Sequence, residues 1–123
     1  MIQLHGSESE EYIKELKALT NKQIIKAISL QKRGDAQNRA ATSADYLLLD
    51  NKGGGSGRTF DWDLIDKIKK PYFLAGGLSS ENVTKAIKKT DPFAVDASSG
   101  IETEGFKDPA KIKKFIWRVR NEQ

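Results

Sequence analysis

Short apolar runs alternate with longer amphipathic segments along this sequence. The apolar runs have the length of β-strands and occupy residues 2–5, 23–28, 46–50, 72–77 and 92–96. Between them, apolar side chains recur every three or four residues, which is the spacing of one face of an α-helix. The pattern is a strand followed by a helix, repeated five times. Strands that are apolar throughout are typical of a parallel sheet covered by helices.

Residues that favour helix ends mark the expected boundaries. Ser7 or Ser9 is placed to cap a first helix that continues to Leu19. The other helices are expected over about residues 34–43, over residues 60–69, after the polar residues 79–82, and from Pro109 onward. Pro71 ends the third of these five helices, and Asp108 is the expected N-cap of the last.

Two architectures fit this pattern, an open doubly wound sheet and a contiguous piece of a (β/α)8 barrel. Hydrophobic periodicity does not separate them, because both alternate apolar strands with amphipathic helices. The length of 123 residues corresponds to one domain, so residues 1–123 are expected to form a single α/β domain.

Composition excludes several classes of protein. The sequence has no cysteine, and therefore neither disulfides nor a thiolate metal site. No apolar run approaches the roughly 20 residues that cross a bilayer, and the first residues do not resemble a secretory signal. The net charge of +4 comes from lysines scattered among acidic residues, which is typical of solvated helix faces rather than of a nucleic-acid surface. We expect a cytoplasmic protein with no membrane or nucleic-acid partner.

The candidate functional residues lie at the carboxyl ends of the strands, where α/β folds place their sites. Read in order, these ends carry His5 with Gly6, Lys26, Asp50, Gly76 with Gly77, and Ser98 with Ser99 and Gly100. Polar residues or glycines at every strand end are what the rim of a single active site would show.

The last two strand ends predict a phosphate site. Gly76 and Gly77 let backbone amides approach an anion closely, and the helix that begins after them favours negative charge. Ser98, Ser99 and Gly100 would add hydroxyl and amide donors. Either group alone is most simply a tight turn or a loop. Together, at successive strand ends, they favour phosphate.

Three single residues have two interpretations each. Asp50 ends an apolar strand, where partial desolvation would raise its pKa enough for a general acid, but a turn aspartate is the simpler interpretation. His5 is the only histidine, and is either a structural hydrogen-bonding residue or part of the site. Lys26 lies within a strand and faces either the site or solvent. No spaced group of histidines and carboxylates predicts a metal.

A glycine-rich loop follows Asp50 and contains Gly54, Gly55, Ser56 and Gly57. It does not fit the phosphate-binding P-loop, which needs a glycine where Lys52 stands and a lysine where Arg58 stands. A mobile active-site lid and a flexible linker are equally compatible with this composition.

The ordered set of these motifs resembles one enzyme family. The motifs are residues 2–6, 25–27, 47–50, 54–62, 74–78 with Asn82 and Val83, and 95–102, followed by Lys107, Asp108, Phe115 and Ile116. In this order and spacing they are similar to phosphoribosylanthranilate isomerase of tryptophan biosynthesis, from about its fourth barrel strand onward. Each motif alone is weak, whereas the set covers nearly the whole chain and is specific.

The resemblance implies a (β/α)8 barrel and an Amadori rearrangement that needs no cofactor or metal. The substrate, N-(5-phosphoribosyl)anthranilate, is a phosphorylated aminosugar that becomes the 1-deoxyribulose 5-phosphate. By this resemblance Asp50 is the general acid that opens the sugar ring, and His5 and Lys26 line the substrate pocket. The residues implied to hold the phosphate are Gly76, Gly77, Ser98, Ser99 and Gly100, and those of the active-site loop are Gly54, Gly55, Ser56 and Gly57.

The sequence departs from the family in its missing catalytic base, which in the family is a cysteine on the first strand. Five of eight strand–helix units are expected here, and the arginine that would meet the anthranilate carboxylate is also missing. Loss of one acid–base partner costs roughly 10²–10⁴-fold in rate, so the chain alone is expected to be a weak or inactive isomerase.

The incomplete barrel would also have bare sheet edges, which favour pairing with other strands. We expect an N-terminal barrel fragment, a homo-oligomer or a rearranged open sheet to cover them. The alternative function is a non-catalytic phosphate-binding or complementing half-barrel module.

Overall fold

The sheet has its strands in chain order. The computed structural model describes residues 1–50, 61–65 and 67–121. The strands are β1 (Ile2–Leu4), β2 (Ile24–Ser29), β3 (Tyr46–Asp50), β4 (Tyr72–Leu74) and β5 (Ala94–Val95), all parallel, in the order β1-β2-β3-β4-β5. A doubly wound sheet reverses its strand order, whereas a barrel adds each strand beside the previous one. The order therefore favours the barrel-type architecture. The prediction of five parallel strands of an incomplete barrel is confirmed, although one of the five expected helices is not found in the described residues.

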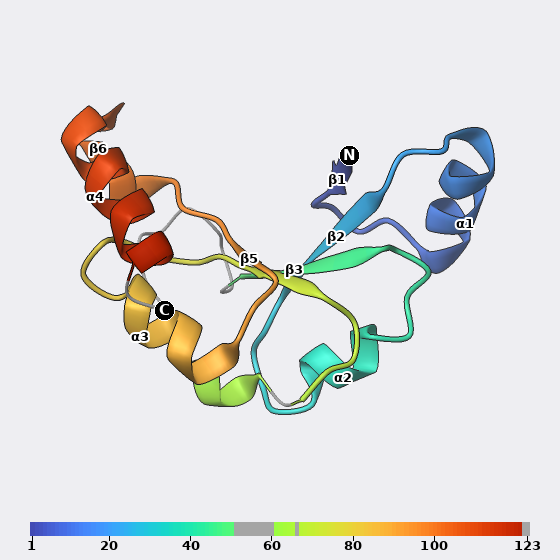
Figure 1. Cartoon of the computed structure of the whole chain (residues 1–123). Helices are drawn as coiled ribbons and strands as arrows, with labels where there is room; N and C mark the ends of the chain where they lie inside the picture. Colours follow the sequence, from blue (N-terminus) through green and yellow to red (C-terminus); the bar gives the residue numbers. More distant parts are fainter. Residues whose placement is uncertain (51–60, 66, 122–123) are drawn as a thin grey trace.

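In the part of the chain that the structure describes, four α-helices connect and cover these strands (Figure 1). They are α1 (Glu10–Leu19), α2 (Asp35–Arg39), α3 (Val83–Thr90) and α4 (Pro109–Asn121). Ser9 caps α1, because its side chain accepts a hydrogen bond of 3.1 Å from the Tyr12 N–H. The Asp108 carboxylate accepts the Ala110 N–H at 2.9 Å at the start of α4, so that predicted cap is also confirmed.

The helix expected over residues 60–69 is wrong. Within the described part of this segment there is only one 3₁₀ turn, η1 (Trp62–Leu64), and Ile65 is already extended with φ −86° and ψ 100°. Both Leu64 and Ile65 pack against the main core, as do Trp62 and Ile68. Tertiary packing of this irregular segment replaces the helix that the local spacing favours.

A small hairpin lies between β5 and α4. A short 3₁₀ turn, η2 (Ser99–Ile101), leads into β6 (Glu102–Thr103), which pairs antiparallel with β7 (Phe106–Lys107). Glu104 and Gly105, which connect the two strands, have φ of 52° and 82°, and a two-residue type I′ hairpin turn requires a positive φ at both positions.

The two faces of the sheet are both apolar but differently covered. The main core joins strand residues such as Leu47, Leu49 and Leu74 to helix residues such as Val83 and Phe115. The opposite face, here called the open face, consists of sheet residues alone: Ile25, Ala27, Tyr46, Leu48, Phe73 and Ala75.

An aromatic group lies on this open face beside the start of β5. The Phe93 ring is centred 5.0 Å from the Tyr46 ring and 5.8 Å from the Phe73 ring, yet 62% of Phe93 is exposed. Within the described residues β1 pairs only with β2, and β5 only with β4. The open face and the two sheet edges are therefore unpaired in this part of the chain.

Candidate functional site at the strand ends

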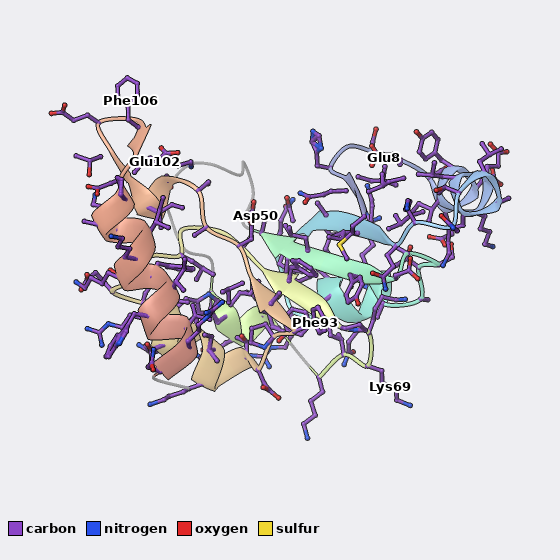
Figure 2. The ribbon with its side chains drawn as sticks, turned by 45° about the horizontal axis from the view of Figure 1, so that its top comes forward. Glu8, Asp50, Lys69, Phe93, Glu102 and Phe106 are labelled. Carbon is purple, nitrogen blue, oxygen red and sulfur yellow. The ribbon has the colours of Figure 1, made fainter. Side chains whose placement is uncertain are left out.

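A hollow of about 1160 Å³ opens at the carboxyl ends of the first three strands. His5, Lys26 and Asp50 all line it, together with residues of the β2–α2 loop and of α2. Figure 2 shows Glu8 and Asp50 toward one side of the sheet, and Phe93 and Lys69 toward the opposite side. The structure thus brings the predicted acid and the predicted pocket residues to one place.

Asp50 is the last residue of β3 and is half-buried. It is the register partner of Ser29 on β2, and its backbone carbonyl accepts the Leu30 N–H at 3.0 Å. This bonding holds the end of β3 against the β2–α2 loop. A carboxylate carried by a strand end has a fixed backbone, which is what a general acid needs in order to meet its substrate at a defined distance.

Lys26 is buried, with 5% of the residue exposed. Its Nζ donates to the Gly6 carbonyl and to Glu8 Oε1, both at 2.7 Å. The hydrogen bond from the Lys26 ammonium is the largest of the influences that hold the pKa of Glu8 below its usual value. The ammonium is therefore bound to the turn that follows β1, although the side chain also lines the hollow.

Charged residues that sequence reasoning missed contribute to the same hollow. Lys32 and Arg39 line it from the β2–α2 loop and from α2, and give it positive charge. Asp35 also lines it, but accepts backbone hydrogen bonds from Gln31 and Lys32, which lower its pKa and shape the loop. Glu8 was missed as well. A lysine inside an apolar strand is a signal for a nearby carboxylate, since a buried ammonium requires a partner.

The two predicted phosphate segments lie against each other. Gly76 and Gly77 have φ of 86° and 66°, a conformation that glycine adopts without strain. A Cβ built on Gly100 would lie 1.9 Å from the Leu78 carbonyl oxygen, so the two backbones touch. The side-chain amide of Asn82 donates to the Gly77 carbonyl at 3.0 Å and fixes the glycine turn before α3.

Neighbouring side chains brace the second of these segments. Lys107 on β7 donates to the Ser98 carbonyl at 3.1 Å and pairs with Glu102. The cradle, meaning Gly76, Gly77, Ser98, Ser99 and Gly100, is therefore a packed pair of backbone turns at successive strand ends.

The predicted active-site loop, with Gly54, Gly55, Ser56 and Gly57, lies outside the described residues. In the part of the chain that is described, no three histidines or carboxylates gather in a way that would hold a metal ion. No helix over the same residues combines the length and apolarity that a membrane crossing requires.

Parallel strands in chain order, with polar residues gathered at their carboxyl ends, define a TIM-barrel-type α/β protein. The family model of N-(5'phosphoribosyl)anthranilate (PRA) isomerase matches residues 1–118. The chain belongs to this family.

Its relatives are longer than the chain. The N-(5'-phosphoribosyl)anthranilate isomerase of Endomicrobium trichonymphae is 47% identical over 125 residues, which cover 98% of this chain and 61% of the relative. The crystal structure of the Thermus thermophilus enzyme superposes with a TM-score of 0.84 at 29% identity, covering 98% of this chain and 60% of that one. A third protein of the family was solved in complex with reduced 1-(o-carboxyphenylamino)-1-deoxyribulose 5-phosphate. It superposes with a TM-score of 0.74 at 33% identity, covering 96% of this chain and 58% of that one. The chain spans about three fifths of these relatives.

Proposed function

We propose that the chain is the carboxyl-terminal part, from about the fourth strand onward, of a phosphoribosylanthranilate isomerase. The reaction converts N-(5-phosphoribosyl)anthranilate into 1-(2-carboxyphenylamino)-1-deoxyribulose 5-phosphate. The observation that carries this proposal is the gathering of His5 and Asp50 in one hollow, next to a glycine–serine cradle at the following strand ends. Membership of the family supplies the reaction that such an arrangement would serve.

In this proposal Asp50 is the general acid. It protonates the ring oxygen of the furanose, the ring C–O bond breaks, and the nitrogen lone pair forms a Schiff base with C1. Removal of the C2 proton by a base then gives an enolamine, which collapses to the ketone. Proton transfer by a positioned acid contributes roughly 10²–10⁴-fold to such a rate.

The phosphate of the substrate would lie in the cradle. Gly76 and Gly77 form a left-handed turn and have no side chains of their own to keep an anion from their amides, and α3 begins at Val83. The close contact of Gly100 with Leu78 would hold the second turn near the first, so that both donate to one anion. Lys32 and Arg39 add positive charge to the hollow in which the rest of the substrate would lie.

The base is proposed to come from outside the chain. The sequence has no cysteine, whereas the family resemblance implies a cysteine base on the first barrel strand. An N-terminal barrel fragment that pairs with the free edges of β1 and β5 would supply it and cover the open face. By itself the chain would then be a weak or inactive isomerase. A homo-oligomer is the other way to cover the edges, and a cytoplasmic location stays a prediction.

A second candidate is a non-catalytic phosphate-binding module. The observation that favours it is that the two predicted phosphate segments lie against each other, whereas the sequence has no cysteine to act as the base.

The test is a fluorescence assay of the consumption of freshly generated phosphoribosylanthranilate. The chain is assayed alone and with an added N-terminal family fragment that bears the Cys-Gly strand. Asp50→Asn is the test variant, and Asp63→Asn, on the exposed η1 turn, is the control. We expect activity only with the fragment, lost in Asp50→Asn and kept in Asp63→Asn.

Two other results would change the conclusion. Strong activity of the chain alone would contradict the external base. Phosphate binding without turnover in either mixture would select the non-catalytic module.

A further inference from the structure

Lys26 is a buried charge whose ammonium donates to a carbonyl and a carboxylate of one turn. The Lys26 cluster, defined as Gly6, Glu8 and Lys26, lies at the carboxyl end of β1. Only 6% of the lysine side chain is exposed, against 22% for that of Glu8. A buried ammonium is costly unless hydrogen bonds satisfy it, so this arrangement calls for an explanation.

The cluster forms a closed set of hydrogen bonds. Lys26 Nζ reaches the Gly6 carbonyl and Glu8 Oε1, both at 2.7 Å, and the Gly6 N–H lies 3.1 Å from each Glu8 carboxylate oxygen. Both backbone polar groups of Gly6 are therefore held by side chains. A Cβ on Gly6 would meet Glu8 Oε2 at 2.7 Å, so glycine lets the carboxylate close over the turn.

The turn held in this way carries His5. Leu4 is the register partner of Lys26, so the lysine starts from the strand directly beside the end of β1. His5, which follows Leu4, is exposed and lines the hollow with Asp50. The hydrogen bonds of Lys26 are thus made to the turn that directly follows His5.

We propose that Lys26 is a positioning residue that, through Glu8 and Gly6, fixes the turn carrying His5 and so sets where His5 meets the substrate. Its effect on ligand binding rests on the function proposed above, whereas its effect on the turn does not. Misplacing a site residue by about 1 Å costs on the order of 10²-fold in catalysis. Loosening the turn that Lys26 and Glu8 hold at Gly6 should therefore weaken the function of His5.

The chain contains a matched control. Lys17 also bonds one backbone carbonyl and one carboxylate, those of Ser43 at 2.8 Å and Asp45 at 3.3 Å. Asp45 directly precedes β3, so this pair lies at the opposite end of the strands from the hollow. The same kind of substitution can therefore be made at either end of the sheet.

The experiment compares Lys26→Met, Glu8→Gln and their double variant with Lys17→Met in the full chain. Nuclear magnetic resonance follows the Gly6 amide and the imidazole of His5, the single histidine, without any ligand. Titration with reduced 1-(o-carboxyphenylamino)-1-deoxyribulose 5-phosphate then gives the affinity of each variant. Circular dichroism checks that each variant is folded, and Glu8→Gln serves if Lys26→Met does not fold.

We expect Lys26→Met to speed exchange of the Gly6 amide and to weaken analogue binding, each by about tenfold, as for loss of a hydrogen bond to a charged group. Adding Glu8→Gln should cost little more, since groups that act as a unit are not additive. Lys17→Met should change neither measurement. Unchanged Gly6 and His5 signals in a folded Lys26→Met or Glu8→Gln chain would overturn the proposal. A wild-type chain that does not bind the analogue counts against the proposed function alone.

Discussion

The contact between Gly100 and Leu78 gives the most direct test of the cradle. A Cβ at residue 100 would lie 1.9 Å from the Leu78 carbonyl oxygen, and real Cβ contacts are essentially never shorter than 3.0 Å. The two backbones must therefore separate by roughly 1.1 Å, the difference of these distances, to accept an alanine. Backbone on both sides of the contact leaves no flexible side chain to move away.

Gly100→Ala should weaken phosphate binding and lower stability together. Forcing extra volume into a packed contact costs typically about 1–3 kcal/mol of unfolding free energy. Donors displaced by about 1 Å from an anion lose much of their hydrogen bonding, so we expect phosphate affinity to fall roughly 10–100-fold. The measurements are urea unfolding and titration with inorganic phosphate, followed by the amide signals of Gly76 and Gly77.

Gly105→Ala is the control for the substitution itself. Gly105 has a φ of 82° and nothing within 4 Å of a built Cβ, so alanine there is strained by its backbone alone. This left-handed strain costs roughly 1–2 kcal/mol, a loss of stability similar to that expected for Gly100→Ala, but Gly105 is not part of the cradle. We expect Gly105→Ala to keep phosphate affinity. The reasoning fails if Gly100→Ala binds phosphate within about twofold of the wild type.

Two further predictions concern the core. Leu74→Ala removes a fully buried side chain of β4 from the main core and should lower the unfolding free energy by about 2–5 kcal/mol, measured by urea unfolding. Burial raises the pKa of Tyr72 above its usual value of 10.0, and its hydroxyl donates to the Thr90 carbonyl. Because the folded state holds this proton more tightly, the contribution of Tyr72 to stability is fully present below pH 10.0 and is lost as the pH rises through the folded pKa. Tyr72→Phe should therefore abolish this part of the alkaline decline in urea-unfolding midpoints.

Local signals were sufficient to place the strands and the ends of two helices, although β4 (Tyr72–Leu74) and β5 (Ala94–Val95) are shorter than the runs expected over residues 72–77 and 92–96. β3 occupies the residues expected, Tyr46–Asp50. A short, continuously apolar run bounded by polar residues is typical of a strand that is buried on both faces of a sheet. Ser9 and Asp108 cap their helices, since capping depends on hydrogen bonds to residues only two or three positions away. The placement of polar residues at the carboxyl ends of the strands follows directly from these strand assignments.

Tertiary contacts decided the remainder. The third predicted helix is replaced by a 3₁₀ turn, because packing against the main core outweighs weak local propensity. The order of strands, which distinguishes a barrel-type sheet from a doubly wound one, is a matter of long-range pairing that periodicity does not contain. The partner of Lys26 is Glu8, 18 positions away, and the partner of Gly100 is the backbone of Leu78.

The sequence by itself therefore determined which residue types lie at each strand end, because alternation and capping act over a few residues. Only the tertiary structure decided that His5 and Asp50 share a hollow, that Lys26 holds a turn, and that the two phosphate segments touch. These are relations between distant segments, and they exist only once the strands lie side by side and bring their ends together.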